Sequence, residues 1–149
     1  MRFYKFRTAV VIYLVKFITW FFAVEIPPIL SVAAIIKKGK KILFIKLSYL
    51  DGYGLPGGLI KSGESVEEGL KREVLEETGL KIVNCRFFGS YPTKSKGIGK
   101  LALVYEVDAV GILKSSSEGT SGWFDPRDLK DNFAYEDNKK AIEDYFENE

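Results

Sequence analysis

From Gly58 to Leu80 the chain reads GLIKSGESVEEGLKREVLEETGL, a stretch that is dense in carboxylates. Its second half carries Glu73, Glu76 and Glu77. If this part is helical, a rotation of about 100° per residue gathers these three side chains within roughly one third of the circumference. Like charges at that spacing repel one another, and a divalent cation or a strongly solvated surface would relieve the repulsion. The stretch therefore predicts either a metal site or a solvated acidic face.

The same stretch contains start and stop signals for a helix. Ser65 is followed three residues later by Glu68, which has the form of a capping box, and Gly79 stands where a left-handed helix stop is expected. Between these signals, apolar residues recur at every fourth position: Val66, Leu70 and Val74. Together they predict a helix from Val66 to Thr78.

The charged residues also follow a fixed spacing. Gly58 is followed after five residues by Glu64, and after seven more by the run from Arg72 to Leu80. This pattern resembles the complete signature box of the Nudix hydrolases, pyrophosphohydrolases that act on nucleoside diphosphates linked to a further group. The flanking segments Leu55–Gly58 and Trp123–Pro126 resemble the family as well. The resemblance implies an α+β fold, an α/β/α sandwich with a mixed β-sheet, in which the box forms loop, helix and loop at the sheet rim.

The resemblance further implies a role for each residue of the box. Glu73, Glu76 and Glu77 would hold Mg²⁺ or Mn²⁺ with the carbonyl of Gly58, Arg72 would orient the glutamates by ion pairing, and Glu64 would support the metal shell. Magnesium prefers oxygen ligands and keeps several waters, so a few carboxylates and substrate oxygens suit it. A bound ion can lower the pKa of an attacking water and neutralise charge that develops at phosphorus.

The implied activity is that of a magnesium-dependent pyrophosphohydrolase. Such an enzyme would cleave a nucleoside diphosphate derivative, such as ADP-ribose, or a nucleoside triphosphate by water attack on phosphorus. The alternative is a non-catalytic Nudix domain that binds a nucleotide or a partner at a membrane surface. Domains of that kind commonly lose an acid of the box, and all of the acids are present here.

Four residues outside the box are candidates for the site. The resemblance implies that Lys46, at the end of a predicted strand, touches substrate phosphate, and that Glu118, in a loop remote from the box, is the catalytic base. Glu76 or Glu77 could serve as that base instead. Aromatic faces stack on nucleotide bases, and we predict this role for Tyr53 and Tyr91. Other aromatic residues flank the same predicted rim loops: Tyr49, Phe88, Phe133 and Tyr135.

The rest of the chain fits one globular domain over residues 27–149. The full sequence of 149 residues is 46% hydrophobic and 28% charged, which is enough to bury a core. β-Branched and alternating segments predict four strands, and a helical spacing of apolar residues predicts a closing helix. These elements are Ile29–Ile36, Lys41–Leu47, Leu80–Tyr91, Lys100–Val110 and the helix Glu136–Glu147. We expect Gly97 and Gly99 to mark the turn between the last two strands.

Composition excludes several classes of site. The chain has no histidine, which excludes a histidine base and a histidine-ligated zinc site. Cys85 is the single cysteine, so no disulfide can form within the chain, and a reducing, cytoplasmic setting fits. A formal net charge of +2 is too small to indicate a stable nucleic-acid partner.

The first 26 residues predict a separate apolar helix. Ala9 to Val24 is a run of sixteen residues in which Lys16 is the single charge. At about 1.5 Å per residue such a helix spans roughly 24 Å, short of the approximately 30 Å of a bilayer core, so a spanning helix is disfavoured. Its broad apolar face must be covered by its own domain, by a homodimer partner, or by a membrane surface. The last of these would be aided by basic residues upstream, which are Arg2, Lys5 and Arg7.

Overall fold

The computed structural model describes residues 11–18, 20–21, 27–95, 97–129 and 132–147. Ten elements follow the N-terminal helix along the chain. They are β1 (Ile29–Lys38), β2 (Lys41–Leu47), β3 (Tyr53–Gly54), β4 (Gly57–Leu59), α2 (Val66–Thr78), β5 (Lys81–Ser95), β6 (Ile98–Val110), β7 (Gly119–Phe124), α3 (Pro126–Leu129) and α4 (Glu136–Glu147).

The strands form one mixed sheet of seven, in the order β3-β2-β1-β6-β5, with β4 paired to β1 and β7 paired to β2. The strands β1 and β6 run parallel, in a register that places Ile29 opposite Lys100. The pairs β1–β2, β1–β4, β2–β3, β2–β7 and β5–β6 are antiparallel. The predicted mixed sheet is thus confirmed.

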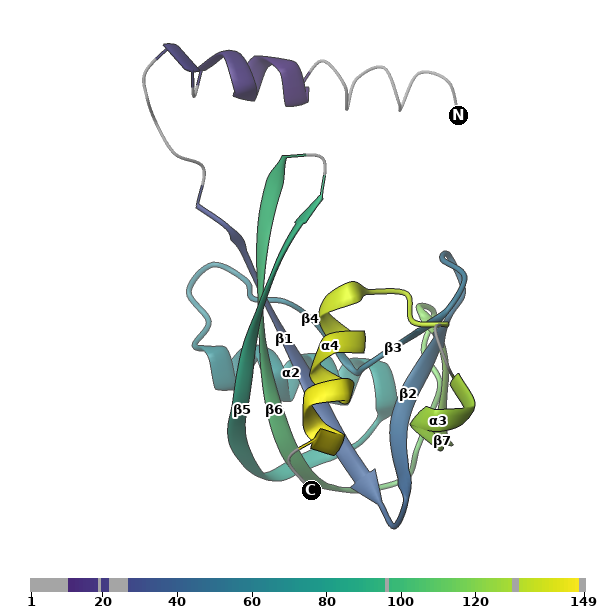
Figure 1. Ribbon diagram of the computed structural model, residues 1–149. Coiled ribbons are helices and arrows are strands. Elements are labelled where there is room, and N and C mark those ends of the chain that lie inside the picture. Colours follow the sequence, from purple (N-terminus) through teal and green to yellow (C-terminus); the bar gives the residue numbers. More distant parts are fainter. Residues whose placement is uncertain (1–10, 19, 22–26, 96, 130–131, 148–149) are drawn as a thin grey trace.

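Helices cover both faces of this sheet (Figure 1). Alternate residues of β1 point to opposite sides, because side chains alternate along a strand. Val32 and Ala34 pack with Leu70 and Val74 of α2. On the other face lies a second cluster that includes residues of β1, β2 and α4, namely Ala33, Ile35, Ile42, Phe44, Ala141, Ile142 and Tyr145. The predicted α/β/α sandwich is therefore present.

The helix α2 begins and ends at the predicted residues. The Ser65 hydroxyl accepts a hydrogen bond from the Glu68 amide at 3.2 Å, and a Glu68 carboxylate oxygen accepts one from the Ser65 amide at 2.8 Å. Gly79 ends the helix in the left-handed conformation, with φ of 73°. Of the two glycines expected in the β5–β6 turn, Gly97 has a positive φ of 84°, whereas Gly99 lies within β6.

The chain is helical at residues 11–18 and 20–21, and Figure 1 shows this helix beyond the end of the β5–β6 hairpin, apart from the sandwich. Its large apolar side chains are exposed, so packing on its own domain, one of the three covers that the sequence leaves open, is not observed for the described residues. Among the described residues, no helix combines the length and the apolar character that crossing a membrane requires. The predicted basic group of Arg2, Lys5 and Arg7 lies outside the described residues, as do residues 22–26.

Candidate active site

The buried side of α2 fixes the direction of its polar side. Leu70 and Val74 have no exposed surface and anchor the helix on the sheet. Because residues three and four apart share a helix face, this anchoring turns Glu73 and Glu77 toward the neighbouring strand β4. The helix and β4 are joined by the loop at residues 60–65, so the box folds back on itself at the sheet rim.

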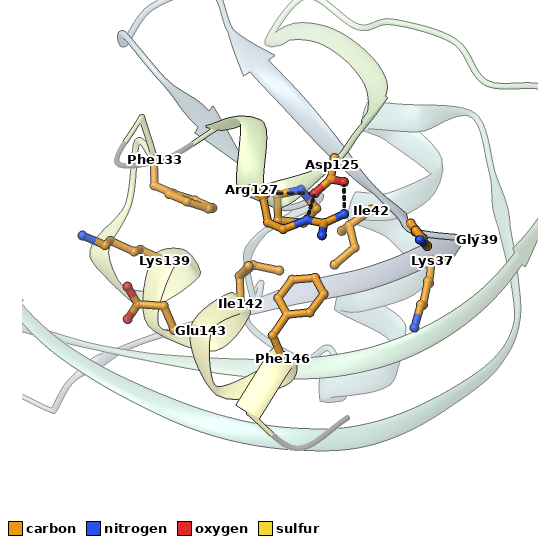
Figure 2. A pocket seen from close by; sticks show the side chains of 12 residues that line it. Lys37, Gly39, Ile42, Asp125, Arg127, Phe133, Lys139, Ile142, Glu143 and Phe146 are labelled. Carbon is orange, nitrogen blue, oxygen red and sulfur yellow. Dashed lines mark hydrogen bonds and ion pairs between the residues drawn. The ribbon is translucent and has the colours of Figure 1, made fainter.

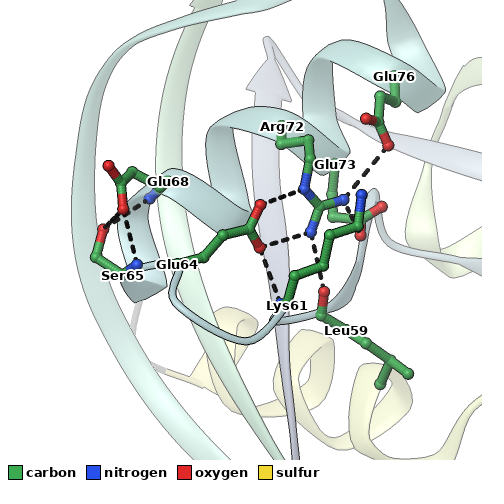
Figure 3. A network of polar contacts seen from close by, with 8 residues as sticks. All are labelled: Leu59, Lys61, Glu64, Ser65, Glu68, Arg72, Glu73 and Glu76. Atoms are coloured by element: carbon green, nitrogen blue, oxygen red, sulfur yellow. Dashed lines mark hydrogen bonds and ion pairs between the residues drawn. The ribbon is translucent and has the colours of Figure 1, made fainter.

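Arg72 is the hub of an ion-pair network on α2 (Figure 3). Its Nε and Nη2 donate to the two carboxylate oxygens of Glu64 at 2.5 and 2.9 Å, and Nη2 also donates to the carbonyl of Leu59 at 3.0 Å. Its Nη1 donates to Glu73 at 2.5 Å and lies 3.4 Å from Glu76. The hydrogen bond from Arg72 lowers the pKa of Glu64 to about 2, and the bond to Glu64 raises the pKa of Arg72. Arg72 thereby ties the loop and the helix together and holds the Glu73 carboxylate in one place.

Glu77 is a buried carboxylate beside other carboxylates. Its residue is 5% exposed, and one of its oxygens accepts a hydrogen bond from the amide of Gly57 at 2.7 Å. Burial raises the pKa of Glu77 to about 8, and repulsion from Glu118 and Glu73 adds to the rise. A group in such surroundings is protonated near neutral pH unless a cation joins it.

Glu118, which lies far from the box in the sequence, is close to Glu77 in the fold. It lies in the turn before β7, and its carboxylate is close enough to Glu77 to raise the pKa of Glu77. Its carbonyl accepts hydrogen bonds from the amide and the hydroxyl of Ser48, at 2.9 and 3.0 Å, and the Ser121 hydroxyl donates to the carbonyl of Glu77 at 3.1 Å. The end of β2 and the start of β7 therefore position this carboxylate.

Gly58 allows the close approach of β4 and α2. A Cβ placed on Gly58 would lie 2.6 Å from the carboxylate carbon of Glu73. Only a residue without a side chain leaves that space, so the backbone of Gly58 and the carboxylate of Glu73 share one corner of the site.

The donors at this corner fit a hard divalent cation in their chemistry. All of them are oxygens: the carboxylates of Glu73, Glu77 and Glu118 and the backbone of Gly58. Within the described parts of the chain, no three acidic or thiol side chains lie close enough together to hold a metal ion by themselves. Magnesium takes few protein ligands and completes its shell with waters and substrate oxygens, so an incomplete protein cage suits it. The side chain of Glu76 is 55% exposed and pairs with Arg72.

A cavity of about 720 Å³ opens beside this corner. Among its lining residues are Gly57, Gly58, Glu73, Glu118, Tyr49, Tyr135 and Lys100. The hydroxyls of Tyr49 and Tyr135 lie 3.0 Å apart, and burial raises the pKa of Tyr135. The Lys100 Nζ lies 2.6 Å from Asp137 and 5.0 Å from the centre of the Tyr135 ring. The lining of the cavity thus combines carboxylates, aromatic rings and a lysine.

The three predicted substrate-binding residues lie outside the lining of this cavity. Lys46 is exposed on β2, and Tyr53 packs edge to face on Phe124 with ring centres 4.9 Å apart. Tyr91 is 6% exposed within the core under α4, where burial raises its pKa to about 12. The stacking role does not suit Tyr91, since its ring offers no free face.

Tyr49, Tyr135 and Lys100 line the cavity instead of the three predicted residues. Tyr49 and Tyr135 belong to the rim aromatics that the sequence brings forward without ranking them. Lys100 belongs to a basic cluster beside a predicted turn, with Lys94 and Lys96, and such a cluster is more typical of a solvated turn than of phosphate steering. The parallel pairing of β1 and β6 brings Lys100 beside the cavity, and nothing local in the sequence indicates that pairing.

A second cavity, of about 560 Å³, lies away from the box (Figure 2). It is lined by the β1–β2 turn, by Asp125 and Arg127, and by residues of α4 that include Ile142 and Phe146. No residue of the box lines it, and of its two lining acids, Asp125 and Glu143, Asp125 pairs with Arg127, whose Nη2 lies 2.6 Å away. We therefore place the candidate site in the cavity beside α2.

Comparison with known proteins agrees with this geometry. A sequence model described as NUDIX domain matches residues 27–145. An ADP-ribose pyrophosphatase of Methanocaldococcus jannaschii is 33% identical over 79% of this chain and 73% of its own length. An NAD-capped RNA hydrolase NudC of Mannheimia succiniciproducens is 39% identical over 48% of this chain and 31% of its own length. A NUDIX hydrolase structure from Nitrosomonas europaea superposes with a TM-score of 0.73 at 25% identity, over 82% of this chain and 90% of that one.

Proposed function

The chain belongs to the Nudix hydrolase family, and from that premise we propose that it is a pyrophosphohydrolase dependent on Mg²⁺ or Mn²⁺. We further propose that it cleaves the phosphoanhydride bond of a nucleoside diphosphate derivative such as ADP-ribose. A nucleoside triphosphate is the second substrate class. The observation that carries the proposal is the buried Glu77, flanked by Glu73 and Glu118 at the end of a cavity large enough for a nucleotide.

In this proposal the carboxylates of Glu73 and Glu77 and the carbonyl of Gly58 hold the cation, with Glu76 and Glu64 in supporting places. When bound, the cation would lower the pKa of a water and screen charge on the phosphates. Arg72 keeps Glu73 in position, since its guanidinium is itself fixed by Glu64 at 2.5 and 2.9 Å.

Glu118 is our candidate for the general base. It sits next to Glu77 on a turn that is hydrogen-bonded to Ser48, so its carboxylate faces the corner where the attacking water would stand. A base must come within hydrogen-bond reach of the proton it removes, and Glu118 is among the residues that line the cavity. Glu77 remains the alternative base.

The aromatic part of the cavity would hold the nucleoside. Tyr49 and Tyr135 offer aromatic surface there, and a base stacks on such rings without strong selection among bases. Lys100 adds positive charge near the path of the phosphates. ADP-ribose is favoured by the named activity of the M. jannaschii relative, which matches this chain over most of both lengths. A cytoplasmic setting, where such nucleotides occur, completes the proposal.

The test is a substrate panel with the purified full-length chain, with and without Mg²⁺. We expect AMP and ribose 5-phosphate from ADP-ribose, in a metal-dependent reaction. Glu77→Gln should lower kcat by at least about 100-fold, since it removes a buried metal ligand. Glu67→Gln is the matched control, because Glu67 is an exposed glutamate on the same helix. Equal turnover by Glu77→Gln and the control would contradict the role of Glu77 in catalysis. A wild-type chain that binds nucleotides without metal-dependent turnover would favour a non-catalytic nucleotide-binding domain.

A further inference from the structure

The N-terminal helix exposes a larger apolar surface than any other described element. Eight large hydrophobic side chains among residues 11–18 and 20–21 are exposed by 37 to 79%: Val11, Tyr13, Leu14, Val15, Phe17, Ile18, Trp20 and Phe21. The aromatic rings also cluster along the helix, with the Phe17 ring centre 6.3 Å from that of Trp20 and 5.9 Å from that of Phe21. Surface of this extent marks an interaction site.

The polar edge of this helix is turned toward the domain. A Cβ placed on Gly97, in the β5–β6 turn, would lie 3.5 Å from the Lys16 Cε, so the lysine side chain lies against the hairpin end. Leu14 and Ile18, two residues to either side of Lys16, lie about 160° away from it around the helix. The apolar face therefore points away from the sandwich, as the placement of the helix in Figure 1 allows.

Two aromatic residues, Tyr13 and Trp20, border this apolar face on one side. Tyr13 and Trp20 lie about 60° and 40° from Lys16, between the lysine edge and the apolar arc. Tyrosine and tryptophan have an apolar body and a polar tip, and both are enriched where lipid headgroups meet acyl chains. The order of lysine, aromatic border and aliphatic face across the helix is that of a helix lying in the plane of a membrane surface.

The charge of residues 1–26 favours a membrane surface over a second copy of the chain as the partner of this apolar face. Residues 1–26 contain four basic side chains and one acidic one, Glu25. The basic side chains are Arg2, Lys5, Arg7 and Lys16. Two copies that met through this segment would bring like charges together, whereas a bilayer with anionic lipids attracts them.

We propose that the N-terminal helix attaches the protein to the surface of an anionic membrane. Leu14, Ile18 and Phe17 enter the boundary between headgroups and acyl chains, and Lys16 stays at headgroup level on the side of the domain. The β5–β6 hairpin, with the exposed Lys94 near its turn, then stands next to the lipid surface. This inference is independent of the proposed catalytic activity.

The test is flotation of the full-length chain with vesicles of phosphatidylcholine alone or with about one third phosphatidylglycerol. We expect the chain to float with the anionic vesicles and partition about a hundredfold more weakly onto neutral ones, given roughly fivefold for each of the three net positive charges of residues 1–26. Leu14→Glu/Ile18→Glu should abolish flotation while hydrolysis of soluble nucleotide stays unchanged. Val83→Glu is the matched control, because it changes a 62% exposed apolar residue of β5.

Two results would overturn the proposal. One is a wild-type chain that stays with the soluble fraction in the presence of anionic vesicles. The other is a wild-type chain that is dimeric by light scattering without lipid and becomes monomeric in Leu14→Glu/Ile18→Glu, since a second copy would then cover the face. Insertion has its own readout, because the emission of Trp20, isolated by Trp123→Phe, should shift to the blue when anionic vesicles are added.

Discussion

Replacing Gly58 by alanine should damage the site and spare the fold. The new Cβ would stand 2.6 Å from the Glu73 carboxylate carbon and 2.7 and 2.8 Å from its oxygens. To reach ordinary contact at 3.4 Å, the carboxylate must retreat by about 0.8 Å. The end of a glutamate side chain can make that shift by rotation, so we expect the free energy of unfolding to fall by no more than about 1 kcal/mol.

The same displacement should be costly for activity. It moves Glu73 off the Arg72 Nη1, from which it lies 2.5 Å away, and out of its place beside Glu77. A misplacement near 1 Å can cost on the order of 100-fold in rate, so we expect kcat/KM for Gly58→Ala to fall by about 10- to 100-fold, with a higher Mg²⁺ requirement.

Gly57→Ala provides the contrast for this prediction. Its Cβ would lie 2.1 Å from the carbonyl oxygen of Val32, which is backbone of the central strand and cannot rotate away. We expect a loss of about 3 kcal/mol or more in the free energy of unfolding. Urea denaturation of both variants and steady-state kinetics with titrated Mg²⁺ measure these effects. The reasoning fails if Gly58→Ala keeps wild-type kinetics, or if it is destabilised as strongly as Gly57→Ala.

Three further predictions concern pH, ion pairing and stacking. In metal-free buffer the pKa of Glu77 is raised from 4.5 to about 8, so between these pH values the folded chain holds a proton that the unfolded chain releases. The free energy of unfolding should therefore fall as pH rises from about 4.5 to about 8. Urea denaturation midpoints measured with EDTA should show this slope in the wild type and lose it in Glu77→Gln. Lys100→Ala leaves the 2% exposed Asp137 without its cation and should cost about 3 kcal/mol in urea denaturation, most of which the double variant with Asp137→Asn should recover. Tyr49→Ala should raise KM about 10-fold or more if its ring stacks on the base, whereas Tyr91→Phe, a change within the core, should leave KM unaltered; equal KM values would refute the stacking role.

Local signals in the sequence predicted the box helix to the residue. Ser65 and Glu68 hydrogen-bond to backbone amides within the first turn of the helix, and Gly79 ends the helix through its own positive φ. These signals are local, so they can be recognised without knowing the rest of the fold. The ion pairs of Arg72 follow in the same way, because Glu73 and Glu76 lie beside it on the helix and the loop returns Glu64 to it.

The substrate end of the site depends on contacts that sequence does not reveal. Lys100 lies in β6, which pairs in parallel with β1, and Tyr135 directly precedes α4. Their contact depends on how these distant segments are arranged in the fold, which no local sequence signal indicates. Tyr91 shows a second cause of error. The ladder of β5 with β6 is irregular between Ile82 and Asn84 and again between Phe87 and Gly89, and for Tyr91, which follows both bulges, the two shifts of face cancel. Its ring is buried because α4 covers that face of the sheet, and no local signal at Tyr91 indicates this cover.

The central strand also sets the order in which the protein can be built during synthesis. β1 pairs in parallel with β6, and the two partners are roughly 70 residues apart in the chain. A ribosome that makes residues in order releases the N-terminal helix long before it releases β6, and parallel pairing over that separation is slow to form. The apolar helix is therefore already exposed to its surroundings while the central strand pair of the domain that follows it is still incomplete.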